Sequence, residues 1–82
     1  MKNFTYVYVL QSKADPDRHY TGMTDDLHDR IRRHNAGEVS HTAKFAPWNI
    51  RVAVAFADRE RAAAFEAYLK SHSGRVFSSR HF

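Results

Sequence analysis

The stretches FTYVYVLQ (residues 4–11) and RHYTG (residues 18–22) decide the fold of this 82-residue chain. The first carries apolar, aromatic and β-branched residues on both faces, which is typical of a buried central strand. The turn-forming residues ADPD (residues 14–17) separate it from the second stretch. The two stretches therefore predict a β-hairpin that places Tyr20 beside the first strand, with Gly22 ending the second strand.

A helix is predicted directly after this hairpin, over residues 25–36. Thr24 or Asp25 can cap its start through the following backbone N–H groups, and Gly37 is placed to terminate it. Residues 39–48 show no periodicity and contain a proline, so this segment is expected to be a loop.

The rest of the chain predicts one more strand and at least one more helix. Residues 50–56 alternate large apolar residues with Arg51 and small alanines, which indicates a strand backed closely by helices. An alanine-rich helix should follow over residues 59–71, with Ser73-Gly74 breaking it before a short helix in the tail 75–82. The order β-β-α-β-α predicts a single α+β domain over residues 1–82, with a small, mostly antiparallel three-stranded sheet flanked by helices.

Composition restricts the class of protein. Cysteine is absent, so structural disulfides and thiolate zinc sites are excluded. No apolar run approaches the roughly 20 residues of a membrane span, and we expect a soluble, cytoplasmic protein with no membrane partner. The net charge is +4, and no acid follows Glu66. Such a basic surface suits nucleic acid, although small soluble proteins often carry a few net charges.

Two polar residues of the first predicted helix point toward its junction with the sheet. Leu27 and Ile31 set the core direction, and Arg30 and His34 lie only about 20 to 60° from Leu27 on a helical wheel. A guanidinium directed there needs a partner, because an unpaired buried charge is very costly. Without further features, the favoured interpretation is structural: an arginine that reaches solvent and a histidine bonded to a backbone carbonyl.

Glu66 lies at the corresponding edge of the second long helix, whose core stripe is Ala62, Phe65 and Leu69. As a functional residue it would be a hard oxygen ligand for Mg²⁺, which takes one or two protein oxygens plus substrate phosphate. The structural alternative is an ion pair with Lys70, one turn later on the helix.

Aromatic residues and histidines offer further candidates. Tyr6 and Tyr8 share one face of the first strand, where a core role is the simpler interpretation for either one. The six histidines show no spacing typical of zinc sites. In the loop, Lys44 and Phe45 combine basic and aromatic character that suits contact with a phosphate or a base, whereas Trp48 is expected to pin the loop to the core.

In order and spacing these residues resemble the GIY-YIG nuclease superfamily, and the chain is similar to the N-terminal nuclease domain of the bacterial excision-repair endonuclease subunit. The matching positions are the two motif tyrosines, the motif glycine, the helical arginine, the residue one turn after it and the metal-binding glutamate: Tyr8, Tyr20, Gly22, Arg30, His34 and Glu66. The sequence departs from the motif at Tyr6 and Thr21, which replace its glycine and isoleucine, and at Met23, where the repair enzymes often carry a lysine.

The resemblance implies a metal-dependent endonuclease that hydrolyses nucleic acid phosphodiester bonds, with DNA favoured over RNA. Glu66 would hold one Mg²⁺ or Mn²⁺ ion, and Arg30 would clamp the phosphate. Tyr8 or Tyr20 would activate water, relayed with His34, and the choice between the two tyrosines stays open.

Surface bases and targeting complete the expectations. Four basic residues are expected to contact nucleic acid: Arg33, Lys44, Lys70 and Arg75. Target selection would be weak or supplied by a partner protein. Two alternatives remain: a catalytically idle nucleic-acid-binding module of the same fold, and an interaction protein in which the residues between helix and sheet are structural.

Overall fold

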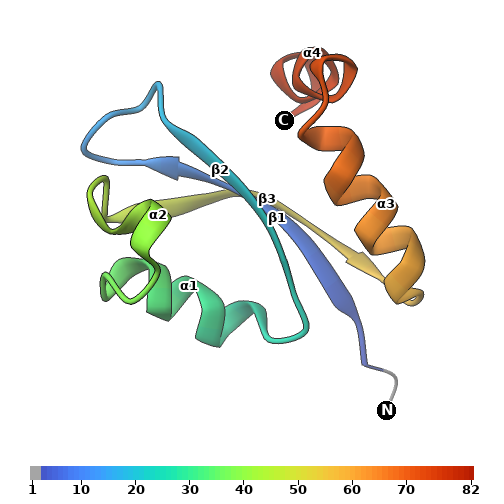
Figure 1. Ribbon diagram of the computed structural model, residues 1–82, viewed down its shortest axis with the longest axis horizontal. Helices are drawn as coiled ribbons and strands as arrows, with labels where there is room; N and C mark the ends of the chain where they lie inside the picture. Colours follow the sequence, from blue (N-terminus) through green and yellow to red (C-terminus); the bar gives the residue numbers. More distant parts are fainter. Residues whose placement is uncertain (1–2) are drawn as a thin grey trace.

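A three-stranded antiparallel sheet, in the order β2-β1-β3, forms the centre of the molecule (Figure 1). The computed structural model describes residues 3–82. The strands are β1 (Thr5–Ser12), β2 (His19–Thr24) and β3 (Trp48–Phe56), and the helices are α1 (Leu27–Asn35), α2 (Ser40–Ala43), α3 (Arg59–Leu69) and α4 (His72–His81). The predicted α+β class and antiparallel sheet flanked by helices are confirmed. The helix α2 adds to the predicted order, and α4 takes up the tail.

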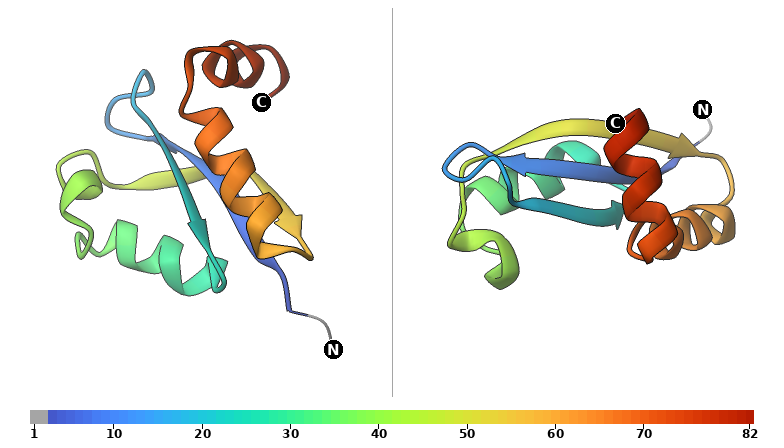
Figure 2. Two further views of the ribbon diagram at one scale, coloured as in Figure 1. Left: turned by 45° about the vertical axis from the view of Figure 1, so that its right-hand side comes forward. Right: turned by 90° about the horizontal axis from the view of Figure 1, so that it is seen from above.

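Helices cover both faces of this sheet (Figures 1 and 2). On one face Tyr8 and Leu10 of β1 pack with α1 and with Trp48, so the predicted core role of Trp48 is confirmed. On the other face Val7 and Val9 pack against α3. Successive side chains of a strand point to opposite faces, so the central strand β1 must be apolar throughout. Among residues 3–82, no helix has the length and apolar composition needed to cross a membrane.

Gly22 lies inside β2, directly opposite Tyr8, and the prediction that it ends the strand is wrong. β2 continues to Thr24. A Cβ atom at position 22 would overlap the Tyr8 hydroxyl group and lie 2.6 Å from Tyr8 Cζ. The glycine therefore creates the space that the ring of Tyr8 fills.

The start of α1 is capped by Asp26, whose carboxylate accepts a hydrogen bond from the Asp29 N–H group at 3.0 Å. Neither Thr24 nor Asp25, the two predicted caps, has this role. The hydroxyl of Thr24 instead accepts from the Asp26 N–H group. Asp25 accepts hydrogen bonds from Thr5 of β1 and from Arg59 of α3, so it links the start of α1 to the helix on the opposite face.

The predicted end of α1 at Gly37 is confirmed. Gly37 has a φ of 76°, and the N–H group of Glu38 donates to the carbonyl of Arg33 at 3.0 Å, a Schellman arrangement. The following segment is predicted to be a loop over residues 39–48. This prediction is wrong for residues 40–43, which form α2. The side chain of Thr42 in α2 is buried against α1. Short-range periodicity does not reveal this tertiary contact.

A β-bulge changes the expected pattern of β3. Val52 pairs with Val9, but Ile50 pairs with Leu10, so Arg51 is the extra residue. Ile50 therefore lies on the α1 face, where it is 46% exposed, rather than on the face of Val52. The alanines at positions 53 and 55 are exposed, so the prediction that helices back this strand closely is wrong for the α1 face.

α3 and α4 meet at a tight corner. Ser71 caps α4 by accepting a hydrogen bond from the Gly74 N–H group at 3.1 Å. The prediction that Ser73-Gly74 breaks a helix is therefore wrong, since both residues lie in the first turn of α4. A Cβ atom on Gly74 would overlap the carbonyl of Tyr68. Glycine is needed here because the backbone of α4 rests directly on the end of α3.

Candidate active site

Tyr8, His34 and Thr42 form a hydrogen-bonded chain inside the protein. The Tyr8 hydroxyl lies 2.9 Å from His34 Nε2, and His34 Nδ1 lies 2.7 Å from Thr42 Oγ1. The three residues are 1%, 0% and 1% exposed. Thr42 donates its only hydroxyl hydrogen to the carbonyl of Val39. His34 Nδ1 must then donate to Thr42, so Nε2 is the acceptor for the Tyr8 hydroxyl.

The buried, hydrogen-bonded environment of Tyr8 and His34 favours the neutral forms of both side chains. Burial lowers the pKa of His34, and the positive charge of Arg30 lowers it further. Burial raises the pKa of Tyr8, with a further contribution from Tyr20. The prediction that His34 bonds to a backbone carbonyl is wrong, because two side-chain hydroxyls satisfy its ring. Nothing in the sequence alone indicates this role for Thr42.

Three of the predicted site residues remain accessible beside the buried chain. Tyr20 packs its ring against His34, with 4.9 Å between the ring centroids, and is only partly buried. Arg30 is partly exposed, and within residues 3–82 it takes part in no ion pair. The side chain of Glu66 is 23% exposed. These three residues can reach a bound molecule, whereas Tyr8 and His34 are enclosed.

Arg30 and Glu66 approach the buried chain from different helices. Arg30 belongs to α1, and Glu66 belongs to α3 on the other face of the sheet (Figure 1). Their charges have opposite effects on the pKa of Tyr8: the positive charge of Arg30 lowers it and the negative charge of Glu66 raises it. The charges of Arg30 and Glu66 therefore reach Tyr8 from helices on opposite faces of the sheet, and not from one junction of helix and sheet as predicted. The sequence could not show on which face each helix packs.

Glu66 is the candidate metal ligand. Its carboxylate lies 3.4 Å from the ammonium group of Lys70, so the ion pair considered as a structural alternative is present. The described residues contain no cluster of three or more His, Asp or Glu side chains able to hold a metal ion. A lone carboxylate is an unsuitable donor set for zinc. It fits Mg²⁺ or Mn²⁺, for which water and substrate phosphate supply the other ligands.

The four predicted nucleic-acid contacts lie in different settings. Arg33 forms an ion pair with Asp29 at 2.9 Å, and Lys44 lies over the ring of Phe45. Lys70 and Arg75 line the same groove, beside the end of α3. The structure thus brings two of the four residues together.

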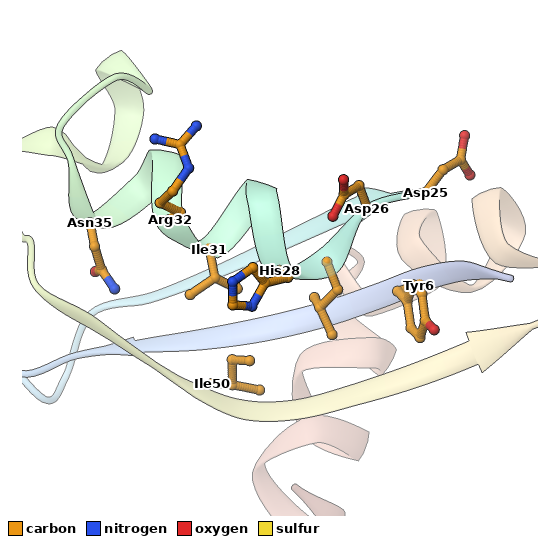
Figure 3. A pocket seen from close by; sticks show the side chains of 9 residues that line it. Tyr6, Asp25, Asp26, His28, Ile31, Arg32, Asn35 and Ile50 are labelled. Atoms are coloured by element: carbon orange, nitrogen blue, oxygen red, sulfur yellow. The ribbon is translucent and has the colours of Figure 1, made fainter.

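A separate groove of about 710 Å³ lies between α1 and β3 (Figure 3). Leu27, Ile31 and Ile50 contribute apolar side chains to it, and polar residues such as His28 and Arg32 also line it. None of the predicted catalytic residues lines this groove. The candidate chemistry therefore lies elsewhere on the molecule.

The buried histidine predicts a specific pH dependence of stability. The pKa of His34 is lower in the folded chain than in the unfolded chain, so the unfolded chain binds more protons in mild acid. This contribution to stability is fully present above about pH 6.5 and is lost as the pH falls toward the lowered pKa. In His34→Gln, urea unfolding should show a weaker loss of stability below about pH 6.5 than wild type. The exposed-site control His72→Gln should retain the wild-type pH profile. Equal profiles for wild type and His34→Gln would contradict the buried neutral histidine.

Comparison with known proteins shows the family of this chain. The GIY-YIG catalytic domain matches residues 4–80. A UPF0213 protein of Lacticaseibacillus paracasei is 34% identical over 85 residues, covering 99% of this chain and 94% of that protein. A UPF0213 protein of Haloquadratum walsbyi is 32% identical over 74 residues, covering 89% of this chain and 81% of that protein. The match extends through both helices that supply the candidate residues, and the chain belongs to the GIY-YIG family of nucleases.

Proposed function

We propose that this protein is an endonuclease that hydrolyses phosphodiester bonds of nucleic acid, with DNA as the favoured substrate and Mg²⁺ or Mn²⁺ as cofactor. One observation carries the proposal. Tyr20, Arg30 and Glu66 are accessible; the ring of Tyr20 packs against His34, and the charges of Arg30 and Glu66 both shift the pKa of Tyr8, the hydrogen-bond partner of His34. A base, a phosphate-binding cation and a hard oxygen ligand are the groups that metal-assisted phosphodiester hydrolysis requires.

Tyr20 is the proposed base. Its hydroxyl oxygen would accept the proton of the attacking water, because Tyr20 is the accessible tyrosine of the pair. Tyr8 is poorly suited to this role, since burial raises its pKa and its hydroxyl hydrogen is committed to His34. Tyr8 and His34 would act as positioning residues that hold the Tyr20 ring in place.

Arg30 is the proposed phosphate clamp. A guanidinium group can donate two parallel hydrogen bonds to phosphate oxygens, a geometry that lysine does not reproduce. Arg30 has no carboxylate partner among residues 3–82, so binding phosphate would not require breaking an ion pair. The positive charge of Arg30 also lowers the pKa of Tyr8, whose ring centroid lies 6.4 Å from that of the proposed base, Tyr20.

Glu66 would hold the divalent cation. When bound, the cation would offset the negative charge that develops on the phosphate during hydrolysis. The proposal is supported by the partial exposure of Glu66 and by the effect of its negative charge on the pKa of Tyr8. Its ion pair with Lys70 is compatible with this role, because an exposed pair of this kind contributes only about 0.3 to 0.5 kcal/mol.

Glu66→Ala tests the proposed function. Losing a charge that acts mainly in the transition state should lower the rate of metal-dependent cleavage by about 10² to 10³. Binding to DNA should persist in the same variant, because removing an anion does not weaken attraction to phosphate. The control Glu60→Ala removes an exposed acid from the same helix and should cleave at the wild-type rate. Wild-type cleavage by Glu66→Ala would overturn the role of Glu66.

A further inference from the structure

We propose that a basic groove between the β1–β2 hairpin and the α3–α4 corner binds the phosphodiester backbone on one side of the scissile phosphate. The groove has a volume of about 820 Å³. Four basic side chains and one carboxylate line the groove: Arg18, Arg51, Lys70, Arg75 and Asp17. This inference rests on the proposed function, which supplies the substrate. It adds the path that the nucleic acid strand takes across the protein.

The fold brings these bases together from distant parts of the sequence. Arg18 comes from the hairpin turn, Arg51 from β3, and the other two from the end of α3 and the start of α4. The hairpin turn and α4 lie toward the same end of the sheet (Figures 1 and 2). The close approach of Gly74 to α3 holds Arg75, the next residue, beside Lys70 at the groove.

The bases differ in how strongly the protein itself engages them. Arg51 donates hydrogen bonds to the main-chain oxygen of Phe82 and to the side chain of Gln11. Arg18 lies 4.6 Å from the centre of the Phe45 ring. Arg75 forms no ion pair within the described residues 3–82. Its charge is therefore the one most available to a phosphate.

The groove adjoins the proposed catalytic residues. Tyr20 contributes to its lining, and Lys70, which also lines it, pairs with Glu66 one helical turn earlier. A nucleic acid strand whose scissile phosphate lies at Tyr20 and Glu66 can continue directly into the groove. Contacts to the backbone position a nucleic acid but carry no sequence information, so the groove should bind strands of any sequence.

Binding measured without catalysis tests the groove. We would titrate wild-type protein with a fluorescent DNA duplex in the presence of chelator and follow anisotropy from 50 to 200 mM salt. Arg75→Ala should weaken binding about fivefold at 0.15 M salt and reduce the slope of log K against log salt by about 0.9, the value of one phosphate contact. Arg80→Ala removes an exposed arginine of α4 that does not line the groove, and it should leave the slope unchanged. Equal slopes for the two variants, or salt-independent binding by wild type, would overturn the proposal.

Cleavage of shortened substrates tests the direction of the strand. Removing nucleotides from one side of the cleavage site should raise KM and leave kcat unchanged, and Arg75→Ala should then add no further effect. An equal effect of Arg75→Ala on full-length and on both kinds of shortened substrate would contradict the assigned path. If no substrate is cleaved, the proposed function fails, while the anisotropy measurement still decides whether the groove binds nucleic acid.

Discussion

Tyr20→Phe should lower the rate of nucleic acid cleavage by a factor of about 10² to 10⁴, the usual contribution of a positioned general base. The substitution removes only the hydroxyl group and keeps the ring that packs against His34. Thermal unfolding should therefore remain close to wild type, because no packing is lost. Single-turnover cleavage at saturating protein, measured beside a thermal melt, separates loss of chemistry from loss of folding.

Tyr8→Phe is the matched comparison, since it removes a hydroxyl from the same aromatic cluster. It should cost about 1 to 3 kcal/mol in the free energy of unfolding, because His34 Nε2 loses its hydrogen-bond partner inside the protein. Its cleavage rate should fall much less than that of Tyr20→Phe. Tyr68→Phe, at an exposed tyrosine of α3, should change neither quantity. Wild-type cleavage by Tyr20→Phe would exclude Tyr20 as the base.

Gly22→Ala should destabilise the protein by about 2 to 4 kcal/mol in the free energy of unfolding. The new methyl group would lie 2.6 Å from Tyr8 Cζ and 3.0 Å from Tyr20 Cε2, so both rings would have to move. Overpacking a core typically costs about 1 to 3 kcal/mol, and the displaced Tyr8 would also lose its hydrogen bond to His34. Chemical denaturation measures this loss, and cleavage should fall with it because both motif tyrosines are displaced.

Gly37→Ala provides the control for Gly22→Ala. Its methyl group would meet only the Ala43 side chain, at 3.9 Å, so its cost arises from the positive φ and should be about 1 kcal/mol. In a Tyr8→Phe background, Gly22→Ala should cost less than in wild type, because the hydroxyl that the methyl group would overlap is absent. Equal stability of Gly22→Ala and wild type would contradict the close packing of Tyr8 across β2.

Short-range sequence patterns predict much of the fold and part of the candidate site. Apolar residues on both faces of residues 4–11 predict a strand covered on both sides, and β1 has this environment. The position of His34 on the inner side of α1 follows from helical geometry alone. Gly37 ends α1 because a left-handed conformation there favours glycine. Each of these features depends on residues close together in the sequence.

Features that depend on tertiary contacts were not predictable in the same way. The bulge at Arg51 reverses the facing of Ile50, and no local pattern marks it. The pairing of His34 with Thr42 requires α2 to fold back onto α1. The placement of α1 and α3 on opposite faces decides how Arg30 and Glu66 approach Tyr8. In each case the determining contact joins segments far apart in the chain.

A cleavage assay with the purified wild-type protein tests the proposed nuclease activity directly. Single-stranded, duplex, flapped and nicked DNA, with matched RNA, would be incubated with Mg²⁺, with Mn²⁺ or with chelator. We expect cleavage of at least one DNA substrate with either metal and none with chelator, because Glu66 would supply the protein ligand for the cation that hydrolysis requires. Protein that binds these nucleic acids but cleaves none of them with either metal would contradict the proposed nuclease activity and identify a catalytically idle binding module.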